Sequence, residues 1–202
     1  MSHPIPRPRF NVCVFCGAGE GTDAAHREAA KALGAALPAR GMGLVYGGAA
    51  VGMMGTVADA CLEAGGHVEG VLPEGLFTRE VAHSGLQRLF QVESMHARKA
   101  LMAGRSDAFV ALPGGFGTLE ELFEVITWAQ LGIHAKPIAL LNVNGYFDRL
   151  LEFLDACREE GFIRPADRRR LLSFSSIDPL LDSLTTWRPE KPVVQWLRGN
   201  EV

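Results

Sequence analysis

The chain has 202 residues, of which 48% are hydrophobic and 21% are charged, and its formal net charge is −3. This composition indicates one globular domain, large enough to bury a core without disulfides or a structural metal. The weakly negative charge gives no general attraction to nucleic acid or to an anionic membrane, and no apolar run is long enough to span a bilayer.

The two ends of the chain are expected to lie outside the folded domain. The first ten residues, MSHPIPRPRF, lack the apolar core of a signal peptide. We therefore expect a cytoplasmic protein with a disordered lead-in over residues 1–9. A single domain is expected over residues 10–187, followed by a peripheral tail at 188–202.

Short apolar runs alternate with helical patterns along the domain. Strands are predicted at 9–16, 44–46, 68–72, 89–92, 108–112, 137–142 and, as an edge strand, 171–175. Helices are predicted at 24–40, from the turn at 47–55 to about 65, at 95–104, from 117 onward, at 147–160, near 162–165 and at 179–186. Thr22 or Asp23 can cap the first helix, and Ser94 the third. This alternation predicts an α/β fold with a Rossmann-like open parallel sheet and helices on both faces.

Glycine-rich turns follow three of the predicted strands, at residues 17–22, 47–55 and 113–118. The carboxyl ends of parallel strands meet at one edge of a sheet, so these turns should converge there. Their convergence predicts a site of nucleotide size. The irregular segment 74–85 follows another strand and is expected to face the same ligand.

The third turn is the most informative stretch of the chain. A buried strand ends at Pro113-Gly114-Gly115, and a helix begins again at Gly117-Thr118. Such a turn presents free backbone N–H groups and the positive end of a helix to a phosphate. Glu120 and Glu121 are expected in the first helical turn, where they either complement the helix dipole or take part in chemistry.

The cysteines and histidines do not predict a metal site. Cys13-x-x-Cys16 lies at the end of an apolar strand, where positions three apart point to opposite faces, and no second cysteine pair has zinc-ribbon spacing. We expect small buried side chains there. The six histidines have no ligand spacing, so no metal is expected.

Several nucleotide-dependent and covalent mechanisms lack their motifs. There is no nucleoside-triphosphate P-loop, no clear acidic partner for an NAD ribose after the second strand, and no nucleophile elbow. Of the four lysines, only Lys99 is near the expected site, which disfavours a pyridoxal-phosphate decarboxylase. The run Arg168-Arg169-Arg170 is interpreted as a solvated helix face.

Two motifs resemble those of a known family. Pro113-Gly114-Gly115-Phe116-Gly117-Thr118-Leu119-Glu120-Glu121 resembles the P-G-G-x-G-T-x-x-E motif of the LOG ("lonely guy") family of cytokinin-activating phosphoribohydrolases, many of which were once called lysine decarboxylases. Met95-His96-Ala97-Arg98-Lys99 resembles that family's M-H-x-R-K motif. The resemblance extends over about residues 10–165.

The resemblance implies a reaction and a set of site residues. The reaction is hydrolysis of the N-glycosidic bond of N6-substituted adenosine 5′-monophosphates to free cytokinin base and ribose 5-phosphate. It implies a Rossmann-like nucleotide-binding catalytic domain without metal or organic cofactor, in a homodimer with active sites near the subunit interface. The matching catalytic residues are Arg98 and Glu121. The matching substrate-binding residues are Glu80, Lys99, Gly114, Gly115, Phe116, Gly117, Thr118, Leu119, Glu120 and Thr127.

Alternative functions and roles remain open at this point. Two other functions fit the sequence: a general AMP nucleosidase, and a non-catalytic nucleotide or cofactor carrier on the same fold. Met53, Met54 and Phe116 are candidates for an N6 pocket or for core packing. Trp128, Leu131 and Ile133 are candidates for the core or for a dimer surface.

The chain departs from the family pattern in two places. Ala18-Gly19 stand where the family commonly has two serines, and Ala49 stands where it commonly has a third glycine. The first departure is expected to alter hydrogen bonds to the phosphate or ribose. The second adds a methyl group near a tight turn. Both bear on affinity rather than on the reaction type.

Overall fold

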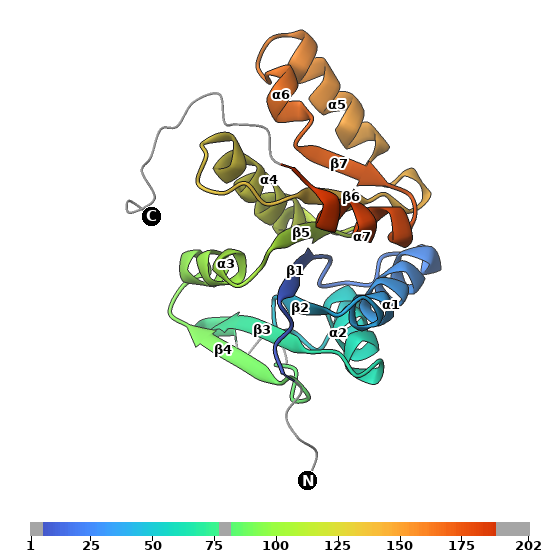
Figure 1. Cartoon of the computed structure of the whole chain (residues 1–202), viewed down its shortest axis with the longest axis vertical. Coiled ribbons are helices and arrows are strands. Elements are labelled where there is room, and N and C mark those ends of the chain that lie inside the picture. Colours follow the sequence, from blue (N-terminus) through green and yellow to red (C-terminus); the bar gives the residue numbers. More distant parts are fainter. Residues whose placement is uncertain (1–5, 77–81, 189–202) are drawn as a thin grey trace.

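The computed structural model describes residues 6–76 and 82–188 of the chain (Figure 1). The expected lead-in falls largely, and the expected C-terminal tail almost wholly, outside these residues. In the described part, no helix is long and apolar enough to cross a membrane. No group of three or more histidine, cysteine, aspartate or glutamate side chains in that part is arranged to hold a metal ion.

Seven parallel strands form one open sheet, which confirms the predicted fold class. The order across the sheet is β4-β3-β2-β1-β5-β6-β7. The strands are β1 Phe10–Phe15, β2 Met42–Tyr46, β3 Val68–Pro73, β4 Arg88–Val92, β5 Ala108–Ala111, β6 Ile138–Leu141 and β7 Leu171–Phe174. The predicted edge strand at 171–175 is therefore confirmed as β7.

The order of the strands reverses between β1 and β5. The chain builds outward from β1 through β2, β3 and β4, and then crosses back to place β5 on the other side of β1. In register, Val12 pairs with Ala108 and Phe15 with Ala111, so the two strands end side by side. In open α/β sheets, ligands bind beyond the carboxyl ends of the strands at such a switch point. The fold thus places the first and third glycine turns next to each other.

Helices cover both faces of the sheet (Figure 1). One apolar cluster joins the sheet to α1, α2 and α7, and a second joins its other face to α3, α4 and α5. The helices are α1 Ala24–Ala39, α2 Gly52–Glu63, α3 Met95–Gly104, α4 Phe116–Gln130, α5 Asp148–Glu159, α6 Pro165–Arg168 and α7 Ile177–Thr186.

Capping residues fix where two of the helices begin. The Asp23 side chain accepts a hydrogen bond from the Ala25 amide at 2.9 Å, and the Ser94 hydroxyl accepts one from the Ala97 amide at 3.1 Å. Both bonds satisfy amides that have no partner inside the helix. Ser94 thereby sets the start of α3, the helix that carries Arg98.

Two predictions about individual side chains have different outcomes. Cys13 and Cys16 are buried in different apolar clusters on opposite faces of the sheet, as predicted. The solvated face for Arg168-Arg169-Arg170 is wrong, because Arg170 is buried and paired with Asp167 at 3.2 Å. The three positive charges predicted solvent exposure. However, α6 is one turn long and ends at Arg168, so Arg170 lies in the link to β7 rather than on a helix face.

Candidate active site

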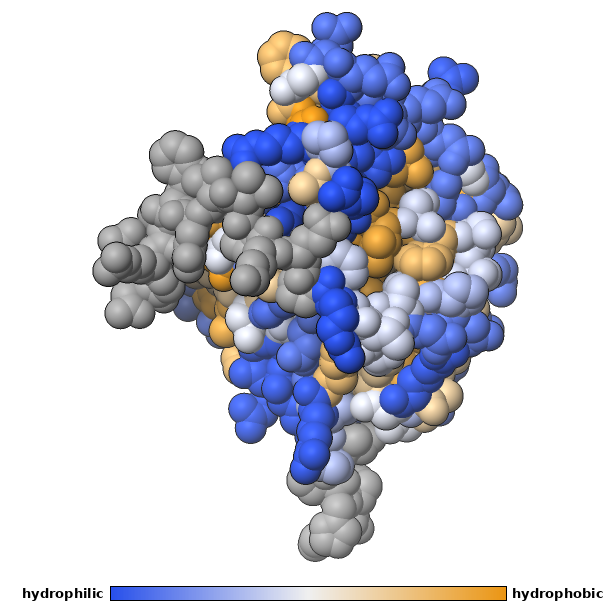
Figure 2. All heavy atoms as spheres, turned by 45° about the horizontal axis from the view of Figure 1, so that its top comes forward, coloured by the Kyte–Doolittle hydropathy of each residue, from blue (hydrophilic) through white to orange (hydrophobic). Residues whose placement is uncertain are grey.

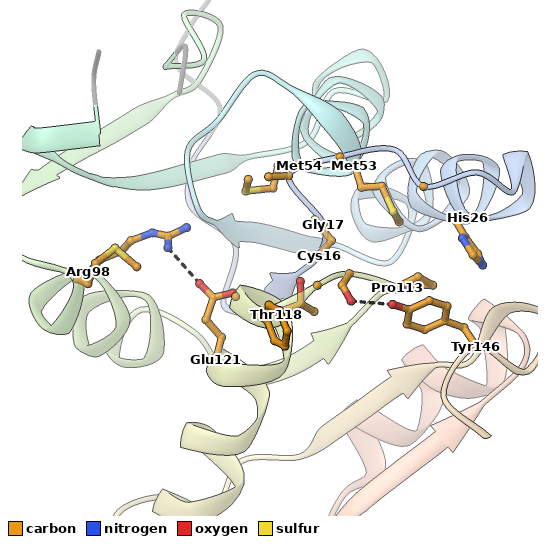
Figure 3. A pocket seen from close by; sticks show the side chains of 18 residues that line it. Cys16, Gly17, His26, Met53, Met54, Arg98, Pro113, Thr118, Glu121 and Tyr146 are labelled. Atoms are coloured by element: carbon orange, nitrogen blue, oxygen red, sulfur yellow. Dashed lines mark hydrogen bonds and ion pairs between the residues drawn. The ribbon is translucent and has the colours of Figure 1, made fainter. Parts of the chain in front are cut away.

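The three glycine turns contact one another at the carboxyl edge of the sheet. The Gly17 amide donates a hydrogen bond to the Pro113 carbonyl at 3.1 Å, which joins the first turn to the third. Gly52 has a φ of +59°, and a Cβ there would lie 2.0 Å from the Ala18 carbonyl oxygen, which joins the second turn to the first. Only glycine fits this close approach. The turns enclose a cavity of about 620 Å³, a size suited to a nucleotide (Figure 3).

One wall of the cavity is the start of α4. Gly115 is the N-cap residue, and no side chain among the described residues caps this end of the helix. The first amides of α4 are therefore available to an anion, and the helix dipole adds positive potential. A Cβ on Gly115 or Gly117 would meet no atom of residues 6–76 or 82–188 within 4 Å, so both glycines border space that this part of the chain leaves open. Gly114 differs, because a Cβ there would lie 2.1 Å from the Thr118 hydroxyl.

Arg98 and Glu121 meet in the same cavity (Figure 3). Arg98 comes from the first turn of α3, and Glu121 from α4. The Arg98 Nη1 lies 3.2 Å from the Glu121 Oε1, and the Arg98 Nε donates to the Val71 carbonyl at 3.1 Å. The exposed fractions of the two side chains are only 9% and 10%. The pair is therefore desolvated, although it borders a space where a ligand fits.

Gly47 makes room for the arginine. A Cβ at this position would lie 2.1 Å from the Arg98 Nη2. The second glycine turn thus leaves space for the Arg98 guanidinium, whereas the third leaves the amides at the start of α4 accessible to a ligand. Sequence reasoning placed both turns at the ligand but did not distinguish these two uses.

The environment of Glu121 favours its neutral form. Burial raises the pKa of its carboxyl from the ordinary 4.5 to about 7, even though the Arg98 charge acts in the opposite direction. Nearby Glu120 and Glu124 also raise the pKa, while Lys99 lowers it. A carboxyl with a pKa near neutrality inside a cavity is a frequent feature of catalytic sites.

The predicted first-turn position of the two carboxylates is wrong. Helix α4 begins at Phe116, so Glu120 and Glu121 lie in its second turn. Phe116 already belongs to the helix, which therefore starts one residue before the predicted Gly117. Complementing the helix dipole therefore does not explain these residues, since that effect fades beyond the first turn.

The structure separates the predicted site residues into groups. Those that line the cavity are Arg98, Glu121, Gly114, Gly115, Phe116, Gly117 and Thr118. Lys99, Leu119, Glu120 and Thr127 are not among the lining residues of this cavity within the described part of the chain. Glu80 lies outside the described residues.

Lys99 and Glu120 form an ion-pair cluster beside the catalytic candidates. The Lys99 ammonium is paired with Glu120, and it donates to the Glu124 Oε1 at 2.9 Å. These contacts join α3 to α4 at Lys99 and Glu120, the sequence neighbours of Arg98 and Glu121. Burial favours a lower pKa for the Lys99 ammonium, but the two carboxylates outweigh burial and raise it. The Thr127 hydroxyl donates a hydrogen bond to the Phe123 carbonyl at 2.7 Å within α4.

The sequence analysis assigned no role at the site to His26, Met95 or Tyr146, all of which line the cavity. His26 and Tyr146 are 120 residues apart in the chain, yet their ring centroids lie 5.3 Å apart in an edge-on contact. Tyr146 follows the strand next to β5, a position that the strand order alone could have brought to the site. Met95 stands in the same motif as Arg98.

The residues with open roles also have definite positions. Met53 and Met54 are buried and line the cavity, whereas Phe116 lines it with 94% of its surface exposed. Of the residues that depart from the family pattern, Ala18 and Gly19 line the cavity. Ala49 is fully buried in the core, where its methyl group is accommodated.

The chain matches a protein family and several known proteins over most of its length. A family described as possible lysine decarboxylase matches residues 54–184. The chain is 52% identical over 178 residues to the probable cytokinin riboside 5′-monophosphate phosphoribohydrolase LOGL3 of Oryza sativa subsp. japonica, covering 88% of this chain and 84% of that protein. It is 49% identical over 178 residues to the cytokinin riboside 5′-monophosphate phosphoribohydrolase LOG1 of Arabidopsis thaliana, with coverage of 88% and 84%.

A solved structure shares the fold at much lower identity. The molybdenum cofactor binding protein from the phototrophic bacterium Rippkaea orientalis superposes with a TM-score of 0.67 at 23% identity, over 90% of this chain and 99% of that one. At this identity the likeness extends to the fold alone.

Proposed function

This chain belongs to the LOG family of cytokinin riboside 5′-monophosphate phosphoribohydrolases, and on that basis we propose that it hydrolyses N6-substituted adenosine 5′-monophosphates. The products are a free cytokinin base and ribose 5-phosphate. One observation carries the proposal: the buried Arg98–Glu121 pair borders the same cavity as an uncapped helix N-terminus. A phosphate group and a reacting glycosidic bond can therefore be held in one space.

The 5′-phosphate binds at the start of α4 in this proposal. Backbone amides of residues 114–118 and the Thr118 hydroxyl donate hydrogen bonds to it. The open space at Gly115 and Gly117 supports this placement, because a phosphate can approach their backbone. Met53 and Met54 line the cavity and offer apolar surface to the base and its N6 substituent.

Glu121 acts on the sugar. Breaking the C1′–N9 bond builds positive charge on the ribosyl ring, and an ionised carboxylate nearby stabilises that charge. Glu121 also orients the attacking water and accepts its proton. The water oxygen then bonds to C1′, the bonding electrons leave with the base, and the proton ends on the base. No further reactant is needed to balance the reaction.

Arg98 serves as a fixed donor of hydrogen bonds. The five N–H donors of a guanidinium hold carboxylates and ring nitrogens by hydrogen bonds, so Arg98 orients Glu121 and the departing purine. The Val71 carbonyl and the space left by Gly47 hold its planar group in place. This support is consistent with a positioned donor rather than a mobile surface arginine.

Product analysis by liquid chromatography tests the proposal. Purified protein is incubated without added metal with isopentenyladenosine monophosphate, its dephosphorylated riboside, and AMP. Base release that is much faster from the first substrate supports the phosphoribohydrolase. Adenine release from AMP at a matching rate would instead support a general AMP nucleosidase. Binding without release of any base would support the carrier that the shared fold also allows.

A homodimer in the cytoplasm completes the proposal. Large apolar side chains are exposed on the described surface, and Figure 2 shows apolar patches between hydrophilic areas on one face. Phe116 and Phe123 are exposed on α4, the helix that carries Glu121, and a second copy of the chain would cover them. Sedimentation is expected to show a dimer at micromolar concentration, and a monomer alone would contradict this part of the proposal.

A further inference from the structure

The loop after β6 is held in one conformation where it reaches the cavity. Asn144 has a φ of +50°, a left-handed conformation uncommon outside glycine. Its side-chain amide donates to the Asp23 Oδ2 at 3.0 Å, and the Phe147 amide donates to the Asn142 Oδ1 at 2.7 Å. Because Asp23 also caps α1, the loop is fastened to the helix that follows the first glycine turn. These contacts fix the position of Tyr146 between them in sequence.

Tyr146 contacts the third glycine turn directly. Its hydroxyl donates a hydrogen bond to the Gly114 carbonyl at 2.7 Å (Figure 3). Its ring makes edge-on contacts with His26, at a centroid distance of 5.3 Å, and with Phe147, at 4.9 Å. The ring is therefore held from two sides, and the hydroxyl is aimed at a single backbone oxygen.

That oxygen belongs to a peptide group that glycine leaves free to rotate. The peptide joins Gly114 to Gly115, and neither residue has a Cβ to restrict the flanking torsions. In a planar trans peptide the C=O and N–H bonds point in opposite directions. Fixing the Gly114 carbonyl on Tyr146 therefore directs the Gly115 amide the other way, and Gly115 both caps α4 and lines the cavity.

We propose that Tyr146 is a positioning residue that holds the Gly114–Gly115 peptide in the orientation required for binding the 5′-phosphate. This inference rests on the proposed function, in which that turn binds the phosphate. Tyr146 acts through the turn, so its effect falls on the affinity for phosphate-bearing ligands. The catalytic pair of Arg98 and Glu121 lies further along the cavity and is left intact (Figure 3).

The test compares two tyrosine-to-phenylalanine variants. Tyr146→Phe removes the hydroxyl that bonds Gly114 and keeps the ring. Tyr46→Phe is the matched control: this buried tyrosine loses the same atom, and its hydroxyl has no hydrogen-bond partner among the described residues. For both variants, kcat and KM are measured on isopentenyladenosine monophosphate and on its riboside, and ribose 5-phosphate binding is measured by calorimetry.

Tyr146→Phe is expected to raise both the KM for the monophosphate and the Kd for ribose 5-phosphate about fivefold. This is the change in affinity that the loss of one typical hydrogen bond produces. Its kcat on the monophosphate and its kcat/KM on the riboside should stay at the wild-type level, as should every parameter of Tyr46→Phe. An unchanged KM and Kd for Tyr146→Phe, or an equal loss on both substrates, would overturn the inference. If the wild-type protein releases no base, the proposed function itself fails, which is a separate outcome.

Discussion

Two arginine–glutamate pairs, each with a buried carboxylate, lie at opposite ends of α3. Arg98, in the first turn, meets Glu121 at the carboxyl edge of the sheet, and Arg105, just past the last turn, meets Glu69 near the amino edge. Both glutamates are desolvated, and burial by itself raises the pKa of each. The pKa of Glu121 rises to about 7, whereas that of Glu69 falls to about 2. Burial alone would raise both pKa values, so the lowered pKa of Glu69 has another cause.

The partners of Glu69 lower its pKa. Glu69 accepts two hydrogen bonds from Arg105, one of them at 2.7 Å, and also contacts His67 at 3.1 Å and Arg7 at 3.3 Å. The Arg105 guanidinium in turn lies 4.5 Å from the centre of the Phe90 ring. Within the part of the chain that the structure describes, Glu121 has one arginine contact, and it also lines the cavity. The Arg105–Glu69 pair, with several partners, is suited to stabilising the fold. The Arg98–Glu121 pair, which borders the cavity, is suited to catalysis.

The two pairs have opposite pH linkage. The folded pKa of Glu69 lies below its ordinary 4.5, so its stabilising contribution is full above about pH 4.5 and is lost as the pH falls toward 2. The folded pKa of Glu121 lies above 4.5, so its ionisation opposes folding above about pH 7, and this cost is relieved as the pH falls from 7 to 4.5.

Glu121→Gln should give the largest effect and break the catalytic pair alone. We expect kcat on the monophosphate to fall by about 10³-fold, because an amide cannot stabilise the positive charge on the sugar. Stability at pH 8 should be equal to or above wild type, since the variant removes an ionised group from a site that disfavours it. Rate assays and urea denaturation measure the two quantities. Retention of most turnover by the folded variant would assign Glu121 a structural role.

Glu69→Gln should break the other pair and reverse the outcome. The free energy of unfolding is expected to fall by about 3 kcal/mol at pH 7, because two arginines then face an uncharged partner. The exposed Glu159→Gln serves as a matched control and should change stability by less than about 0.5 kcal/mol. Turnover per folded molecule should stay at the wild-type level in both. A loss of kcat with unchanged stability in Glu69→Gln would contradict the division between the pairs.

The pH dependence of activity reports the ionisation of Glu121. The proposed mechanism requires ionised Glu121, so kcat/KM should fall about tenfold per unit as the pH decreases below about 7, and should level off above it. The substrate phosphate also titrates, with a second pKa of about 6. The dephosphorylated riboside lacks that ionisation, so its kcat/KM should still fall below pH 7 if Glu121 causes the fall. A flat profile between pH 5 and 8 would be inconsistent with this assignment.

Lys99→Met gives the smallest expected effect. The variant removes the charge that joins α3 to α4 through Glu120 and Glu124, while the long side chain preserves packing. We expect kcat to fall by about two- to fivefold as Arg98 and Glu121 lose their precise spacing. A fall in kcat as large as that of Glu121→Gln would instead support the direct substrate contact predicted for Lys99.

The sequence was sufficient to predict the features that depend on local chemistry. Alternating strands and helices, the Asp23 and Ser94 caps and the opposite faces of Cys13 and Cys16 follow from periodicity and capping rules. The three glycine turns converge because parallel strands share one carboxyl edge. The Arg98–Glu121 contact itself required the two family motifs, because spacing alone did not distinguish it from solvated helix faces.

Other features depend on tertiary contacts that no local pattern contains. Tyr146 reaches the site through a loop after β6, and its target is a backbone oxygen that carries no sequence signal. The burial of Arg170 depends on where α6 meets β7. The pKa difference between Glu69 and Glu121 depends on how deeply the fold buries each carboxylate and on the partners that it brings to each.

A direct titration of the Glu121 and Glu69 carboxyl groups tests whether their pKa values are shifted in opposite directions. Carboxyl ¹³C chemical shifts of the free protein are followed between pH 3 and 9, with Glu121→Gln and Glu69→Gln used to assign the two signals. We predict that the Glu121 signal titrates with a pKa of about 7 and that the Glu69 signal does not titrate in this range. A Glu121 pKa near the ordinary 4.5 would contradict the claim that this buried pair is set apart for chemistry.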